Sequence, residues 1–139
     1  MKKIWDFSPP VDSQSPVIPG DTADRQEWVA TLSNDCPMNV SAIHLSPHVG
    51  AHADAPLHPS TVQHLAELGV KLIGIDSASI DPADRKSLPS HQVIRQCGLR
   101  VLENLLLDDV PEGDYELIAL PLKLMTADPS PVRDVLREL

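Results

Sequence analysis

Hydrophobic and polar positions change along this chain in a way that predicts a mixed α/β fold. Five stretches are rich in β-branched, aromatic or apolar residues and are expected to form strands: residues 2–7, 27–33, 38–46, 70–76 and 114–125. Residues 70–76 are mostly apolar and follow Gly69, which is typical of a buried strand after a helix. In the last stretch, Pro121 indicates a sheet edge or a bulge.

Three helices are expected from their capping signals. They are predicted over residues 61–68, 91–97 and 131–139. Ser60 and Gln63 have the spacing of a capping box, and Ser90 and Ser130 stand in the N-cap position of the other two helices. Glycine follows each of the first two helices, as is common after a helix C-terminus. Together these elements predict an α/β chain folded as a single domain.

Length and charge narrow the classes of function. The chain has 139 residues, which suits one domain, and its net charge of −9 argues against nucleic acid or an anionic membrane surface as a partner. The N-terminus lacks the apolar segment of a signal peptide, and no stretch reaches transmembrane length. Cys36 and Cys97 are expected to be reduced thiols, so we expect a cytoplasmic location.

One short segment carries a group of metal-binding residue types. Its spacing, H-x3-H-x-D-x3-H, comprises His48, His52, Asp54 and His58. In extended backbone all four side chains would point to one face, whereas a helix would have to contain Gly50 and Pro56. Imidazole and carboxylate without thiolate favour Zn²⁺, with Mn²⁺, Co²⁺ or Fe²⁺ as alternatives. The segment therefore predicts a metal site.

The remaining candidates are weaker when taken singly. His44 and His64 are expected to be structural or solvated, and His91 has little meaning by itself. Glu103 lies in the apolar stretch 99–107 and needs a partner, for which a metal is one candidate. Asp76 could be a site residue or could cap the turn that follows it.

Motifs in both halves of the chain resemble the metal-dependent cyclase-like hydrolase family, and within it the bacterial kynurenine formamidases (arylformamidases). The matching segments are residues 5–11, 19–21, 48–58, 71–76, 91–103, 114–123 and 130–133. The resemblance implies a swivelling β/β/α-type domain, and such proteins are typically homodimers.

A binuclear zinc centre is also implied by the resemblance, with two zinc ions per subunit. Its ligands would be His48, His52, Asp54, His91 and Glu103. Asp54 would reach both metals, and Glu103 would bridge or share the pair. His58 would be the general acid/base, although a role as a further metal ligand is the alternative.

The sequence departs from the family pattern in three places. Ile18 replaces a tryptophan that commonly contacts substrate, and Ala51 replaces a threonine. Between Pro59 and Ser60 the family has several dozen further residues that this sequence lacks. We therefore expect a missing segment at this join, one residue after His58.

The function implied is hydrolysis of N-formyl-L-kynurenine to L-kynurenine and formate, a step of tryptophan catabolism. The chain has no Gly-x-Ser-x-Gly motif, so a serine-hydrolase mechanism is unsupported. Two alternatives remain open. One is another amidase of the same family, such as an isatin-type hydrolase, and the other is a truncated, non-catalytic metal-binding domain.

Overall fold

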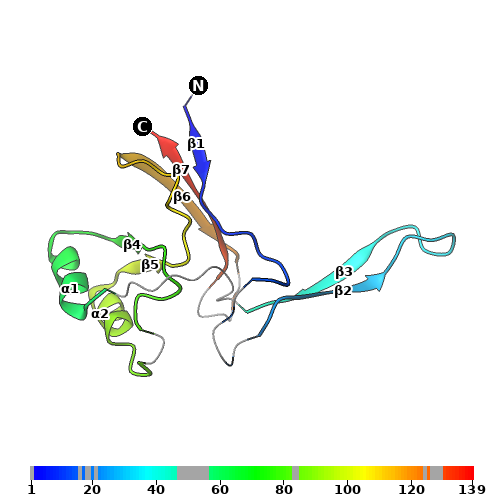
Figure 1. Cartoon of the computed structure of the whole chain (residues 1–139), viewed down its shortest axis with the longest axis horizontal. Helices are drawn as coiled ribbons and strands as arrows, with labels where there is room; N and C mark the ends of the chain where they lie inside the picture. The colour runs from blue at the N-terminus through cyan, green and yellow to red at the C-terminus, as the bar shows by residue number, and fades with distance from the viewer. Residues whose placement is uncertain are drawn as a thin grey trace. The chain divides into compact units, whose positions relative to one another are not determined.

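A computed structural model shows a mixed α/β chain (Figure 1). The structure describes residues 2–15, 17, 20, 22–46, 57–82, 85–123, 125 and 130–139. Contacts between Cα atoms divide the chain into two compact units. The larger unit comprises Met1–Pro9, Ala51–Leu120 and Val132–Leu139, and the smaller one comprises Pro10–Gly50 and Pro121–Pro131.

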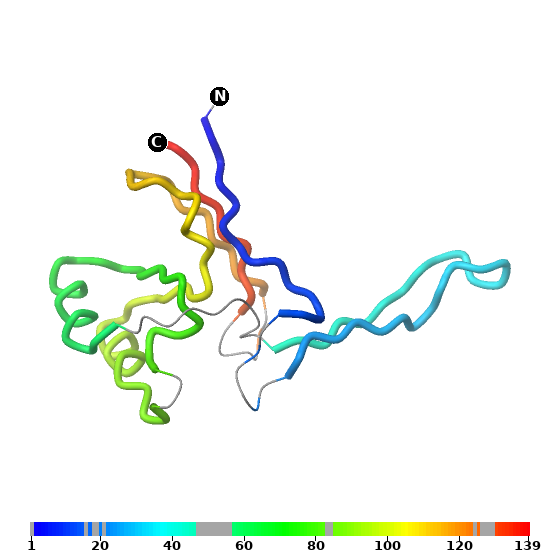
Figure 2. The backbone as a smooth tube through the Cα atoms, in the orientation of Figure 1, coloured from blue at the N-terminus to red at the C-terminus, as the bar shows by residue number. Residues whose placement is uncertain are grey.

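A three-stranded sheet in the larger unit brings the two ends of the chain side by side. Its order is β1 (Ile4–Asp6), β7 (Val132–Glu138), β6 (Tyr115–Pro121), and β1 pairs with β7 in antiparallel fashion (Figures 1 and 2). The ring of Trp5 packs edge-on against Tyr115 with centroids 5.2 Å apart. This aromatic contact joins β1 to β6 across β7.

The C-terminal helix predicted over residues 131–139 is wrong, because Val132–Glu138 form strand β7. Arg133 forms an ion pair with Asp6, and Arg137 forms one with Glu116, so the segment is tied to strands distant in sequence. Ser130 does not cap a helix, since its hydroxyl accepts a 2.9 Å hydrogen bond from the Leu122 amide. Pairing within the sheet overrides a local helix signal here.

The other part of the larger unit packs two neighbouring helices on a pair of parallel strands. The helices are α1 (Pro59–Glu67) and α2 (Pro89–Cys97), and the strands are β4 (Leu72–Gly74) and β5 (Arg100–Leu102). A buried apolar cluster holds them together: Val62, Ile73, Ile75, Ile80, Ile94 and Leu99. The helix–glycine–buried strand pattern expected at residues 61–76 is confirmed, with each helix beginning two residues early at a proline in its first turn.

The predicted glycine ends of both helices are confirmed, but the predicted caps are not. Gly98 ends α2 with a φ of +66°, a conformation that favours glycine. The N-cap of α1 is His58 rather than Ser60, and its ring Nδ1 accepts from the Ser60 amide. Ser90 lies inside α2, where Leu88 holds the N-cap position without a capping side chain.

The smaller unit contains a β-hairpin of β2 (Arg25–Ala30) and β3 (Val40–His44), which Figure 2 shows as one long arm. A bulge interrupts the pairing between Trp28 and Ala30. His44 lies 3.2 Å from the Glu27 carboxylate, in agreement with a structural role. Within the described residues, no helix is long and apolar enough to span a membrane.

Candidate functional site

Three of the seven predicted site residues lie in the described part of the chain: His58, His91 and Glu103. The other four, Ile18, His48, His52 and Asp54, fall outside the described residues. All three described residues belong to the larger unit. The site can therefore be described from the last histidine of the histidine segment, His58, and from the two candidates later in the sequence, His91 and Glu103.

His91 is positioned by the first turn of α2 and by a buried carboxylate. Its Nδ1 lies 2.8 Å from Oδ2 of Asp81, whose side chain is only 1 % exposed. An ionised carboxylate only accepts hydrogen bonds, so Nδ1 donates and Nε2 is left with its lone pair when the ring is neutral. This is the tautomer in which Nε2 can bind a metal.

Asp81 also satisfies the free backbone donors at the start of α2. Its Oδ1 accepts from the Ser90 amide at 2.8 Å, and its Oδ2 accepts from the His91 amide at 2.9 Å. Burial by itself raises the pKa of Asp81, but the hydrogen bonds from His91 and Ser90 outweigh it and hold the pKa below its ordinary value. The carboxylate is therefore ionised at neutral pH and compatible with the helix N-terminus.

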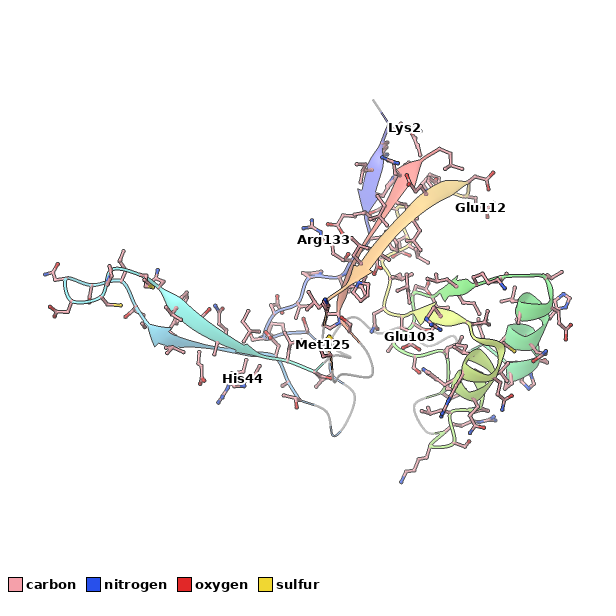
Figure 3. The ribbon with its side chains drawn as sticks, turned by 180° about the vertical axis from the view of Figure 1, so that it is seen from behind. Lys2, His44, Glu103, Glu112, Met125 and Arg133 are labelled. Atoms are coloured by element: carbon pink, nitrogen blue, oxygen red, sulfur yellow. The ribbon has the colours of Figure 1, made fainter. Side chains whose placement is uncertain are left out.

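Glu103, labelled in Figure 3, follows β5 directly. Its carboxylate faces the ring of His91 on α2. Its Oε1 accepts a 2.8 Å hydrogen bond from the Ile80 amide and lies 3.5 Å from Nε2 of His91. A lone pair and a carboxylate oxygen this close repel each other unless a proton or a cation lies between them. The His91 imidazole and the Glu103 carboxylate can therefore bind one cation between them.

His58 occupies the residue before α1 and has the opposite tautomer. Its Nδ1 lies 2.8 Å from the Ser60 hydroxyl and 3.3 Å from the Ser60 amide, which can only donate. The neutral ring therefore has its proton on Nε2. Among the described residues, His58 makes no direct contact with His91 or Glu103. Its exposed ring could donate this Nε2 proton to a bound molecule.

Sequence reasoning did not identify Asp81, which the structure shows as the partner of His91. The residue stands among polar residues before the predicted helix, and nothing in the sequence pairs it with a histidine ten positions later. An Asp-Pro pair before the predicted helix was the one available signal. Asp76, left open between two roles, is exposed and has no hydrogen-bond partner within the described residues.

No group of three or more His, Cys, Asp or Glu side chains is arranged to hold a metal in the part of the chain that the structure describes. Three of the five predicted ligands lie outside that part. The donors present, an imidazole nitrogen with a free lone pair and a facing carboxylate oxygen, nevertheless fit Zn²⁺ as ligand types.

Comparison with solved structures shows the fold. The chain is similar to a "potential metal-dependent hydrolase with cyclase activity", with a TM-score of 0.83, 19 % identity and full coverage of both chains. It is also similar to a "predicted metal-dependent hydrolase" from Bacillus stearothermophilus, with a TM-score of 0.82 and 19 % identity over 99 % of this chain and 98 % of that chain. The expected α/β cyclase-like fold is confirmed.

Comparison with curated proteins shows relatives of higher sequence identity, although no family model matches the chain. Kynurenine formamidase of Delftia acidovorans is 49 % identical over 206 aligned positions, covering 99 % of each chain. Kynurenine formamidase of Paracidovorax citrulli is 46 % identical, and the alignment covers 98 % of this chain and 97 % of that enzyme. Kynurenine formamidase of Bordetella pertussis is 45 % identical, and the alignment covers the full length of both chains. Because 206 positions exceed the chain's 139 residues, several dozen of them have no counterpart here. The chain belongs to the kynurenine formamidase family.

Proposed function

We propose that this chain is a metal-dependent formamidase that hydrolyses N-formyl-L-kynurenine to L-kynurenine and formate. The relatives are named for this activity, and the observation that carries the proposal is the pairing of His91 Nε2 with Glu103 Oε1 at 3.5 Å. These two atoms belong to the two predicted ligands, of five, that lie in the described part of the chain. Their tautomer and charge favour a cation between them.

The ligands that would hold two zinc ions are His48, His52, Asp54, His91 and Glu103. Bound zinc would supply a hydroxide nucleophile near neutral pH, because it lowers the pKa of water towards ~7, and would polarise the formyl carbonyl. Asp81 and the Ile80 amide would keep His91 and Glu103 in place. Ile18 is proposed to line the substrate pocket.

His58 is proposed to move the proton that the reaction needs. Hydrolysis breaks the bond between the formyl carbon and the arylamine nitrogen, and that nitrogen must gain a proton as it leaves. The Nδ1 atom of His58 is engaged with Ser60, so the ring can donate a proton only from Nε2. To act as this acid the ring would first become an imidazolium, with the proton released by the attacking water as its second proton and Nδ1–H facing the Ser60 hydroxyl oxygen at 2.8 Å. Giving the Nε2 proton to the leaving nitrogen would then return the ring to its neutral form.

A non-catalytic zinc-binding chain is the second candidate, and the positions missing from the alignment favour it. We propose that the gap lies between Pro59 and Ser60, at the start of α1, within what is otherwise one domain. In that case the ligands on both sides of the join would still bind zinc.

We also propose that the chain is a cytoplasmic homodimer and that the hairpin of β2 and β3 contributes to the contact. Trp28, Val29 and Ile43 on this hairpin are each more than half exposed. A two-stranded hairpin is at best marginally stable alone in water, so apolar side chains on it indicate a partner. Light scattering of wild type and Trp28→Ser tests this: a monomeric wild type would refute the dimer.

The function is tested by the two histidines that the structure describes. Zinc-loaded wild type should release formate from N-formyl-L-kynurenine. His91→Ala should lose bound zinc together with activity, whereas His58→Ala should retain zinc and lose turnover by about 10²–10⁴. Loss of zinc in His58→Ala would instead make His58 a ligand. An isatin-type substrate assayed in parallel separates this activity from other family members.

A further inference from the structure

We propose that Asp81 is a positioning residue that fixes His91 as the Nδ1–H tautomer and so keeps its Nε2 available to a metal. The inference rests on the metal role proposed for His91. Asp81 itself would not touch metal or substrate, since its two carboxylate oxygens are occupied by Ser90 and His91.

The burial of Asp81 and its three hydrogen-bond donors fix the orientation of the His91 imidazole. Its side chain is 1 % exposed, and three donors converge on it: the amides of Ser90 and His91, and Nδ1 of His91. The backbone amide of His91 and its ring Nδ1 both donate to Oδ2 of Asp81, at 2.9 and 2.8 Å respectively. The imidazole therefore has little freedom to rotate about its side-chain bonds.

Ile80, the residue before Asp81, orients Glu103, the proposed ligand that faces His91. The Ile80 amide donates to Oε1 of Glu103, and Ile80 itself is completely buried in the apolar cluster. One buried turn therefore orients both groups, His91 through a side chain and Glu103 through a backbone amide. This arrangement sets the 3.5 Å approach of Nε2 to Oε1.

Helix capping alone would not require this arrangement. A capping carboxylate needs the two backbone amides, but here the ring nitrogen is bound at 2.8 Å, as close as the Ser90 amide and closer than the His91 amide. Asn at position 81 has nearly the same shape with one acceptor oxygen in place of two. It cannot serve the Ser90 amide and both His91 donors together, so Asp81→Asn disturbs the ring while leaving the volume unchanged.

The matched control is Asp134→Asn, which alters another buried aspartate of the same unit. Asp134 lies on β7, and its backbone contacts Ser8 and Phe7, not the site residues. Both substitutions replace a buried carboxyl group by an amide. A general effect of this replacement or of stability on zinc binding would therefore appear in both variants.

The first readout needs neither zinc nor a variant. Long-range ¹H–¹⁵N NMR is recorded on the metal-free wild type while the pH is raised until the ¹⁵N shifts themselves show a neutral His91 ring. That neutral ring should be protonated on Nδ1. An Nε2–H tautomer would overturn the inference. Because no metal is present, this result is independent of whether the proposed formamidase function holds.

The second readout is zinc affinity measured by competition with a chelator. We expect Asp81→Asn to bind zinc about 10–100-fold more weakly than wild type, and Asp134→Asn to match wild type. Equal affinity in Asp81→Asn, or an equal loss in Asp134→Asn, would overturn the inference. A wild type that binds no zinc would refute the proposed function instead, while the tautomer would still decide the role of Asp81.

Discussion

The hydroxyl of Ser90 donates a 2.7 Å hydrogen bond to the carbonyl oxygen of Leu57, and this bond joins the start of α2 to the residue before His58. The Leu57 amide in turn donates to the Ile80 carbonyl oxygen at 3.1 Å. Leu57 is therefore held by the same two segments that orient His91 and Glu103. Hydrogen bonds thus connect the segments that orient His91 and Glu103 to Leu57, the residue before His58.

Ser90→Ala should destabilise the fold, because it leaves the Leu57 carbonyl oxygen without this donor in a buried environment. Ser90 is completely buried, so we expect a loss of about 1–3 kcal/mol in the free energy of unfolding. Urea denaturation measures it. The exposed Ser87 supplies the control, and Ser87→Ala should change stability by less than about 0.5 kcal/mol. Equal stability of the two variants would show that the bond contributes little.

His58→Asn and His58→Ala should separate the cap from the acid/base role. Asn is a good N-cap residue, whereas Ala is a poor one, so only His58→Ala should lose about 0.5–2 kcal/mol of stability. Both variants should lose turnover by about 10²–10⁴, because neither side chain transfers protons. Thermal denaturation and formate release are measured on the same samples. Full activity in His58→Asn would contradict the proposed proton transfer.

Asp134→Asn should alter how stability depends on pH. Burial raises the pKa of Asp134, and the nearby negative charge of Asp6 raises it further. A group with a raised pKa in the folded state contributes stability below its unfolded pKa, which is lost as pH rises through the folded value. The stability of Asp134→Asn relative to wild type should therefore increase from about pH 3 towards pH 7. Urea denaturation across this range tests the trend, and a constant difference would contradict it.

Local signals predict part of the fold correctly. The helix near residues 61–68 and the end of the next helix at Gly98 are predicted from their glycines, whereas the predicted Ser60 and Ser90 caps are wrong. Strand β7 was missed, because its pairing with β1 joins residues more than 120 positions apart and Ser130-Pro131 imitates a helix start. Asp81 was missed for a similar reason, since only the folded loop brings it to His91. The first-metal ligands His48, His52 and Asp54 stay predictions.

The most direct test is the rate of L-kynurenine formation by the purified 139-residue chain, with and without zinc. We predict that the zinc-loaded chain hydrolyses N-formyl-L-kynurenine, that a chelator abolishes the activity and that added zinc restores it. A folded chain that binds zinc fully and yet produces no L-kynurenine would contradict the proposal, and would identify a metal-binding relative without formamidase activity.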